Sequence, residues 1–266
     1  MKLQQILLPI LLMGAFGAYA LWMMSKRKKM MANLGPAFRA FFERTGYRYT
    51  DIAQAPLDEQ VRKAEADMTA LQRGTKAYEM RVVRDFHGLP VYHHNYMGAP
   101  PAGSGSSATT VMSCRWSVPL AQPPRVLWEV ADRSLSGMGK AVKEAFSNME
   151  RNWAPTYQVR VDTGDAQLDG RFQIYAQDAQ AAHAVPGILA TPGMKEALLA
   201  CPEVCLCVLP GEVYFSDPFQ KNLRSAMGGT LGMMAMGFDM EKMLDIQIPV
   251  HDKITELLAQ TARASA

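Results

Sequence analysis

The sequence predicts an α+β fold, in which an N-terminal transmembrane helix precedes a soluble domain of largely antiparallel sheet with packed amphipathic helices. Three observations predict it. An uncharged apolar run of 19 residues, Ile6–Met24, stands near the N-terminus. Short strand-like segments with polar turns follow, which is typical of antiparallel sheets rather than of βαβ units. Segments with apolar residues at helical spacing lie before and after these strands.

The apolar run Ile6–Met24 has the length of a membrane-spanning helix. At ~1.5 Å rise per residue it spans ~28 Å, close to the ~30 Å hydrocarbon core of a bilayer. Tyr19 and Trp22 lie near its far end, where amphipathic rings favour the membrane interface. We therefore expect residues 1–29 to form a transmembrane anchor with a basic flank, which contacts the lipid bilayer through Ile6–Met24.

The charges beside the run predict its direction. Only Lys2 precedes it, whereas four basic residues follow it: Lys26, Arg27, Lys28 and Lys29. Positive flanks stay in the cytoplasm, so we expect a single-pass protein of the cell membrane with its N-terminus outside and its soluble domain in the cytoplasm. The basic cluster is also expected to contact anionic headgroups. The alternative is a cleaved signal peptide, because Ala18-Tyr19-Ala20 has the A-x-A form.

The charge balance argues against nucleic acid as a partner. The net charge is +3, and the five basic residues around the anchor account for more than all of it. The rest of the chain is slightly acidic and lacks the basic footprint of a nucleic-acid-binding protein.

The four cysteines are expected to be free thiols in a reducing compartment; they are Cys114, Cys201, Cys205 and Cys207.

Residues 30–76 are expected to form a juxtamembrane helical segment. Met30–Gly46 carries an apolar face at helical spacing and ends at a glycine. Pro56–Arg73 begins with proline and two acidic residues and is followed by a glycine, which are usual signals of a helix start and stop. Its narrow apolar stripe predicts a packing seam rather than a binding site.

Residues 77–266 are expected to form the soluble α+β domain, within which a break between two subdomains near residue 154 stays open. Two hairpins are predicted, turning at His87-Gly88 and at Pro210-Gly211. The second turn is expected to be of type II. The predicted strands are Ala77–Phe86, Leu89–Met97, Thr109–Val118, Arg125–Val130, Tyr157–Asp162, Arg171–Ala176, Glu203–Leu209 and Glu212–Ser216.

Amphipathic helices complete this domain. They are predicted at Ser136–Trp153, from Asp178 onward, at Met194–Ala200 and from about His251 to Arg263. Ala226–Met243 differs from the rest because it holds six methionines and four glycines. We interpret this methionine segment as a loop, as a plug that fills the core, or as an adaptable apolar surface for a partner or a lipid.

The second half of the chain has a recognisable order of elements. FQIYAQDAQAAHAV, a short helix, VCLCVL, a turn, VYFSD and a closing amphipathic helix follow one another over Phe172–Ala262. This order resembles an uncharacterised family of bacterial membrane-anchored proteins built around a domain of unknown function. The resemblance implies a mixed α+β domain behind a membrane helix, and it implies no assigned activity.

No assembled catalytic motif marks the sequence, which lacks both a G-x-S-x-G nucleophile elbow and an H-E-x-x-H helix. An enzyme at the membrane surface stays the alternative, with a site assembled from distant residues; its polar candidates are Asp85, His87, Asp162 and Asp178. His93 and His94 point to opposite faces of a strand, so we expect surface histidines of a hairpin rather than metal ligands.

A second alternative is a lipid- or metal-handling module around the methionine segment. Cys201, Cys205 and Cys207 offer soft ligands, and the methionines could add thioethers for Cu(I). The C-x2-C spacing typical of zinc sites is absent, and buried structural cysteines are favoured. The leading hypothesis is therefore a membrane-anchored cytoplasmic binding or scaffolding protein with an unidentified protein partner. It assigns no catalytic, cofactor-binding or metal-binding residues.

Overall fold

The structure, a computed structural model, describes residues 32–72, 78–98, 111–133, 155–217 and 239–265, together with Leu21, Trp22, Met24, Ser25 and Lys28. Among these residues, no helix is both long and apolar enough to cross a membrane. Most of the predicted anchor Ile6–Met24 lies outside the described residues. The predicted helix Ser136–Trp153 and residues 226–238 of the methionine segment lie outside them as well.

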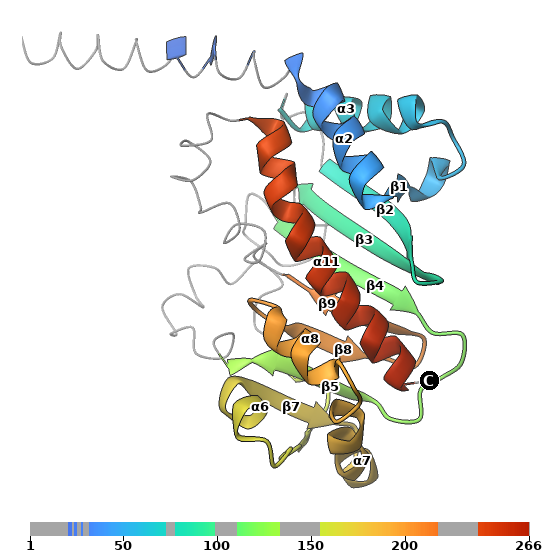
Figure 1. Ribbon diagram of the computed structural model, residues 1–266, viewed down its shortest axis with the longest axis vertical. Coiled ribbons are helices and arrows are strands. Elements are labelled where there is room, and N and C mark those ends of the chain that lie inside the picture. Colours follow the sequence, from blue (N-terminus) through green and yellow to red (C-terminus); the bar gives the residue numbers. More distant parts are fainter. Residues whose placement is uncertain are drawn as a thin grey trace, which may run out of the picture.

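One antiparallel sheet forms the scaffold, and it confirms the predicted α+β class (Figure 1). Within the described ranges it has nine strands in the order β1-β2-β3-β4-β9-β8-β5-β7-β6. The strands are β1 Arg48–Tyr49, β2 Tyr78–Phe86, β3 Leu89–Gly98, β4 Val111–Pro119, β5 Trp128–Asp132, β6 Val159–Arg160, β7 Phe172–Ala176, β8 Cys205–Val208 and β9 Glu212–Ser216. Strands on both sides of residue 154 share this sheet, because β4 pairs with β9 and β5 pairs with β7 and β8.

Both predicted hairpins are present. In the β2–β3 hairpin, His87 and Gly88 have φ values of 52° and 80°, the positive values that a tight two-residue turn of type I′ requires. In the β8–β9 hairpin, the Leu209 N–H donates to the Glu212 carbonyl at 2.8 Å. Gly211 does not have a positive φ, so the predicted type II turn is wrong.

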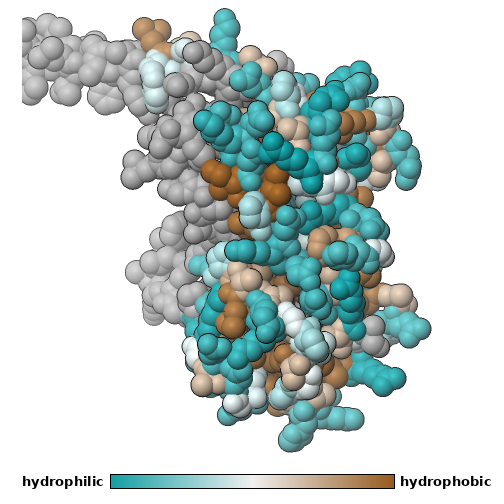
Figure 2. Space-filling view, in the orientation of Figure 1, coloured by the Kyte–Doolittle hydropathy of each residue, from teal (hydrophilic) through white to brown (hydrophobic). Residues whose placement is uncertain are grey.

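The helices with buried faces lie on one side of the sheet, where their apolar residues meet the inward residues of the strands. The helical elements are α2 Leu34–Thr45, the short 3-10 helix η1 Thr50–Ile52, α3 Leu57–Gln72, α6 Ala166–Arg171, α7 Ala179–Leu189, α8 Met194–Ala200 and α11 Met240–Ser265. Figure 1 shows α11 lying along this side, from α2 at one end toward α7 at the other. The same side is mostly hydrophilic at its surface, with a hydrophobic patch over the first half of α11 (Figure 2).

The core consists of two apolar clusters that α11 joins. The larger one holds Trp116 and Trp128 of the sheet and the second half of α11, including Ile254 and Leu258. The smaller one holds the aromatic face of α2, the inward residues of β2 and Met240 at the start of α11. The predicted juxtamembrane segment therefore packs on the same helix as the main domain.

Local signals explain where several helices begin and end. Gly46 ends α2 in the left-handed conformation at φ 72°, and its N–H donates to the Phe42 carbonyl at 2.9 Å, as the sequence predicts. The Asp178 carboxylate accepts the Ala181 N–H at 2.8 Å and caps α7, a helix that the sequence predicts from this residue onward. Asp165 caps α6 in the same way, although no helix was expected at this position.

Several predicted boundaries are wrong, and the strand predicted at Glu203–Leu209 is shortened to β8. The closing helix begins at Met240 rather than near His251, because Pro249 lies inside α11 and its usual helix-breaking effect is overridden by the packing of both halves. β5 begins at Trp128 rather than at residue 125, after a proline-containing stretch. β6 is limited to Val159–Arg160, so most of the strand predicted over residues 157–162 is irregular.

Candidate functional site

The side of the sheet opposite the helices carries one continuous row of residues in register. Each member is the direct partner of the next across all nine described strands: Arg48, Val83, Tyr92, Ser117, Tyr214, Cys207, Glu129, Tyr175 and Arg160. Directly opposed residues of antiparallel strands share a face. We call this set the tyrosine row, since Tyr92, Tyr214 and Tyr175 recur along it.

A groove of about 320 Å³ opens on this face over β2, β3, β4 and β9. We call it the sheet groove; its lining includes Thr50, Arg81, Tyr92, His94, Arg115, Ser117 and Glu212. Tyr92 is 40% exposed, which is unusual for a large aromatic residue in the centre of a strand. The groove therefore offers aromatic surface and polar groups on a rigid backbone.

The charges in and beside the sheet groove are paired, within β2 and between neighbouring strands. The Glu79 carboxylate accepts from Arg81 at 2.6 Å and lies 3.0 Å from the His94 Nε2. Burial raises the pKa of Glu79, but hydrogen bonds from Arg81 and His94 outweigh it, so this pKa lies below its usual value. Arg115 pairs with Glu212, and its guanidinium lies 4.2 Å from the Tyr214 ring centroid.

Farther along the tyrosine row, Glu129 and Cys207 are buried beneath Tyr157. The Glu129 carboxylate accepts the Tyr157 N–H at 2.9 Å, and the Tyr157 hydroxyl donates to the Val208 carbonyl at 2.8 Å. Burial raises the pKa of Glu129 and raises that of Cys207 to about 12. A thiol with such a high pKa is a poor nucleophile, so this pair lacks the activation that covalent catalysis requires.

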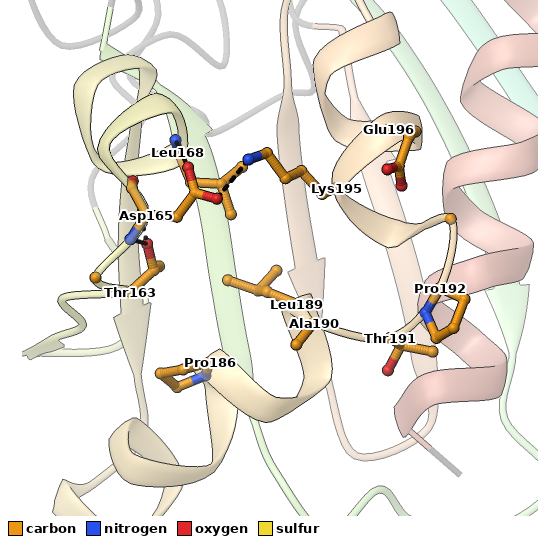
Figure 3. A pocket seen from close by; sticks show the side chains of 12 residues that line it. Thr163, Asp165, Leu168, Pro186, Leu189, Ala190, Thr191, Pro192, Lys195 and Glu196 are labelled. Atoms are coloured by element: carbon orange, nitrogen blue, oxygen red, sulfur yellow. Dashed lines mark hydrogen bonds and ion pairs between the residues drawn. The ribbon is translucent and has the colours of Figure 1, made fainter.

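A second cavity, of about 410 Å³, lies on the helical side between α6 and the loop that joins α7 to α8 (Figure 3). The Lys195 ammonium points across it to the Asp165 carboxylate, and this ion pair holds the pKa of Asp165 below its usual value. Thr163 and Asp165 lie on one side of the cavity in Figure 3, and Thr191 and Glu196 lie toward the other. The Lys195 ammonium in this cavity is already paired with Asp165, and most of the other lining residues belong to helix caps and loops.

A buried cluster of aromatic and basic side chains lies between the sheet and α11. The His93 ring stacks on the Trp116 indole, with centroids 4.3 Å apart and planes 7° from parallel. The Trp116 Nε1–H donates to the His251 Nδ1 at 3.4 Å. Arg84, also buried, donates to Thr255 at 2.6 Å and to Asp252 at 2.9 Å. The prediction that His93 is a surface histidine is therefore wrong, whereas its neighbour His94 is partly exposed.

The polar candidates for an enzymatic site do not meet. Asp85 lies at the end of β2 and His87 in the turn that follows, where the Asp85 carboxylate accepts the Gly88 N–H at 3.0 Å. Asp162 follows β6 at the far edge of the sheet, where it accepts the Gly164 N–H, and Asp178 caps α7. These four residues are engaged in local turns and caps rather than in a shared site.

The three cysteines offered as metal ligands are free thiols in the structure, and Cys201 and Cys207 are buried. In the described part of the chain, no three His, Cys, Asp or Glu side chains are grouped as a metal site. Residues 226–238, which would supply most of the thioethers, lie outside that part.

The sequence did not predict the buried cluster, because His93 was expected at the surface by residue type and neither Arg84 nor His251 was assigned a role. Two patterns indicate its position. Arg84 follows Met80 and Val82 at strand alternation, and His93 follows Val91, so both share the inward parity of their strands. His251 precedes Ile254 and Leu258 at helical spacing, so it lies on the apolar face of α11.

Comparison with family models finds none that matches the chain, and comparison with curated proteins finds no relative. The resemblance of Phe172–Ala262 to a bacterial membrane-anchored family stays a prediction. Among solved structures, the crystal structure of the mycobacterial trehalose monomycolate transport factor A matches with a TM-score of 0.36 and 9% identity, over 81% of this chain and 94% of that one. A similarity at this level carries no inference about fold or function.

Proposed function

We propose that the chain is a single-pass membrane protein whose α+β domain lies in the cytoplasm and binds a protein partner through the sheet groove. The observation that carries this proposal is the combination of an exposed Tyr92 with Arg115 stacked on Tyr214 in one groove. Tyrosine and arginine are the residue types enriched at protein interfaces and at their energetic centres. The groove's paired charges favour a polypeptide, which offers both donors and acceptors, over a strongly charged ligand.

The rigidity of the sheet supports the same function. Tyr92, Ser117 and Tyr214 lie on three adjacent strands in one register row. Their backbones are fixed by hydrogen bonds on both sides, so little conformational entropy is lost when a partner binds. Cationic and aromatic side chains at fixed spacing then determine which partner segment fits the groove.

Affinity capture of the full-length protein from its native membrane tests the proposal. The chain offers a matched pair of exposed arginines that each bond to a carboxylate, namely Arg115 with Glu212 in the groove and Arg39 with Asp58 on the helical side. We expect one reproducible partner with the wild type and with Arg39→Ala. The double variant Tyr92→Ala/Arg115→Ala should lose it. Equal recovery from the double variant would refute binding through the groove.

The membrane anchor and its direction require a separate test. The full chain, tagged at its C-terminus, is expected to stay in the membrane during alkaline extraction. In intact cells the tag should be protected from external protease. Digestion of the tag by external protease would reverse the proposed orientation. Release of the protein by alkali would contradict a membrane-spanning anchor and would agree with cleavage after Ala18-Tyr19-Ala20.

A further inference from the structure

Two buried histidines meet between the sheet and α11. His93 of β3 is 2% exposed and His251 of α11 is 1% exposed. Their ring centroids lie 4.9 Å apart in an edge-to-face arrangement, and both rings contact the Trp116 indole. Two imidazoles at this distance from one another are compatible when both are neutral, and they repel one another when both are charged.

Groups from every neighbouring element face this pair. Phe41 and Tyr47 contact His251 from α2 and the segment after it. β4 contributes Cys114, whose Sγ lies 3.4 Å from the His93 Nε2, and the backbone N–H of Asp217 after β9 donates to the Cys114 carbonyl. The charged groups of the network are Arg84 of β2 and Asp252 of α11, which bond to each other, and the buried Asp217, whose charge acts on the Cys114 thiol. His94, the next residue in β3, contributes further positive charge when protonated.

The hydrogen bonds of the pair suit neutral rings. Trp116 is only a donor, so its 3.4 Å bond to the His251 Nδ1 requires that nitrogen to be unprotonated; the Tyr47 hydroxyl lies 3.5 Å from the same nitrogen. The His93 Nδ1 is buried and has no hydrogen-bond partner among the described residues. A second proton on either ring would therefore oppose the Trp116 N–H or create an unpaired charged donor. No bond between either imidazole and a carboxylate is present in the described residues to compensate this charge.

Protonation of the two histidines would weaken the contact between α11 and the sheet. This helix joins the two apolar clusters, with Met240 in one and Ile254, Leu257 and Leu258 in the other. His251 lies between these contacts, and Arg84 attaches its neighbours Asp252 and Thr255 to β2. We propose that the His93–His251 pair is an acid-sensitive latch, which holds α11 on the sheet while both rings are neutral and releases it when both take up protons.

The direction of the pH effect follows from the difference in histidine pKa between the folded state and the open state. Burial, followed by the charge of Arg84, lowers the pKa of His251 from 6.5 to about 3. Burial, His251, His94 and Arg84 lower the pKa of His93 well below 6.5. Because the open state binds protons more readily, the latch is intact above pH 6.5 and weakens as the pH falls toward the folded-state pKa values. Between pH 7.5 and 5, opening should increase about 30-fold from His251 alone, and His93 should increase it further.

Hydrogen exchange of the full-length protein in detergent measures this opening directly. After correction for the intrinsic pH dependence of exchange, amides of α11 from Val250 to Ala262 should lose protection between pH 7.5 and 5. Amides of β7 should keep most of theirs, because that strand is not attached to the latch. If protection of α11 is the same at both pH values in the wild type, the latch does not exist, and no variant is needed for that conclusion.

A non-titrating variant identifies the groups responsible. In His93→Gln/His251→Asn the new amides can occupy the positions of the ring nitrogens without gaining a charge. Its α11 exchange should change less than about 10-fold over the same pH range, whereas the exposed-histidine control His183→Gln should respond like the wild type. A full acid response in the folded double variant would assign the protons to other groups and overturn the proposal.

Discussion

The guanidinium of Arg84 donates a 2.6 Å hydrogen bond to the hydroxyl of Thr255, which lies 171 residues later in the chain. Both side chains are buried, and the bond attaches α11 to β2. Arg84 also donates to the Thr45 carbonyl at the end of α2 and stacks over the Tyr47 ring at 4.9 Å. One side chain therefore connects the first helix, the sheet and the last helix of the described fold.

Arg84→Ala is expected to destabilise the fold. The change removes a buried network and leaves the Thr255 hydroxyl and backbone carbonyls without their donor, which costs about 2–4 kcal/mol. Urea denaturation followed by circular dichroism measures the loss. Arg81→Ala on the same strand is the control, because that side chain is 64% exposed and its ion pair contributes less than about 1 kcal/mol. Equal losses in both variants would contradict a central role for Arg84.

Glu129→Gln is expected to stabilise the protein increasingly as the pH rises. Burial raises the folded-state pKa of Glu129 above the 4.5 typical of the free side chain, so the protonated form is favoured in the fold. Its contribution is full below pH 4.5 and is lost as the pH rises through the folded-state pKa. Glutamine does not ionise and keeps an acceptor for the Tyr157 N–H. Urea midpoints of the two proteins should agree at pH 4 and diverge by pH 7; a constant difference would show that Glu129 is not perturbed.

The thiols are expected to resist labelling in the native protein. Burial raises the pKa of Cys201, Cys205 and Cys207 to about 12 and that of Cys114 well above 9. Thiolate concentrations are therefore low at neutral pH. With a chromogenic disulfide reagent, the partly exposed Cys205 should react slowly and the other three only after denaturation. Rapid reaction of three or four thiols in the native state would contradict this packing.

Two substitutions at Asp165 separate its two roles. Its carboxylate caps α6 by accepting the N–H groups of Gln167 and Leu168, and it also pairs with Lys195. Asp165→Asn keeps the cap and loses the ion pair between two side chains that are each 33% exposed, which should lower the melting temperature little. Asp165→Ala loses both and should lower the melting temperature more. Equal thermal shifts for the two variants would show that the cap contributes little.

Features set by neighbouring residues could be predicted from the sequence. The His87-Gly88 turn, the α2 end at Gly46 and the α7 start at Asp178 depend on preferences within a few positions, and the structure has all three. The early start of α11 could not be predicted in this way. Pro249 disfavours a continuous helix locally, and only packing against both apolar clusters outweighs that preference.

The candidate sites could not be predicted from the sequence, because they consist of residues that are distant in the chain. Residue type placed His93 at the surface, although its strand parity with Val91 points inward. The tyrosine row requires the strand order, since Tyr92 and Tyr214 become near neighbours only because β9 pairs with β4. No spacing within either hairpin predicts that pairing, and neither the sheet groove nor the Arg84 network could be located before the strand order was known.

Site-specific photo-crosslinking tests the proposed function most directly. A photoreactive amino acid replaces Tyr92 in the sheet groove or, as the control, Arg39 on the exposed side of α2 in the full-length protein. Irradiation of intact cells should yield one discrete crosslinked product from position 92 and none of the same mass from position 39. The absence of a product at position 92, or the same product from both positions, would contradict binding of a partner through the sheet groove.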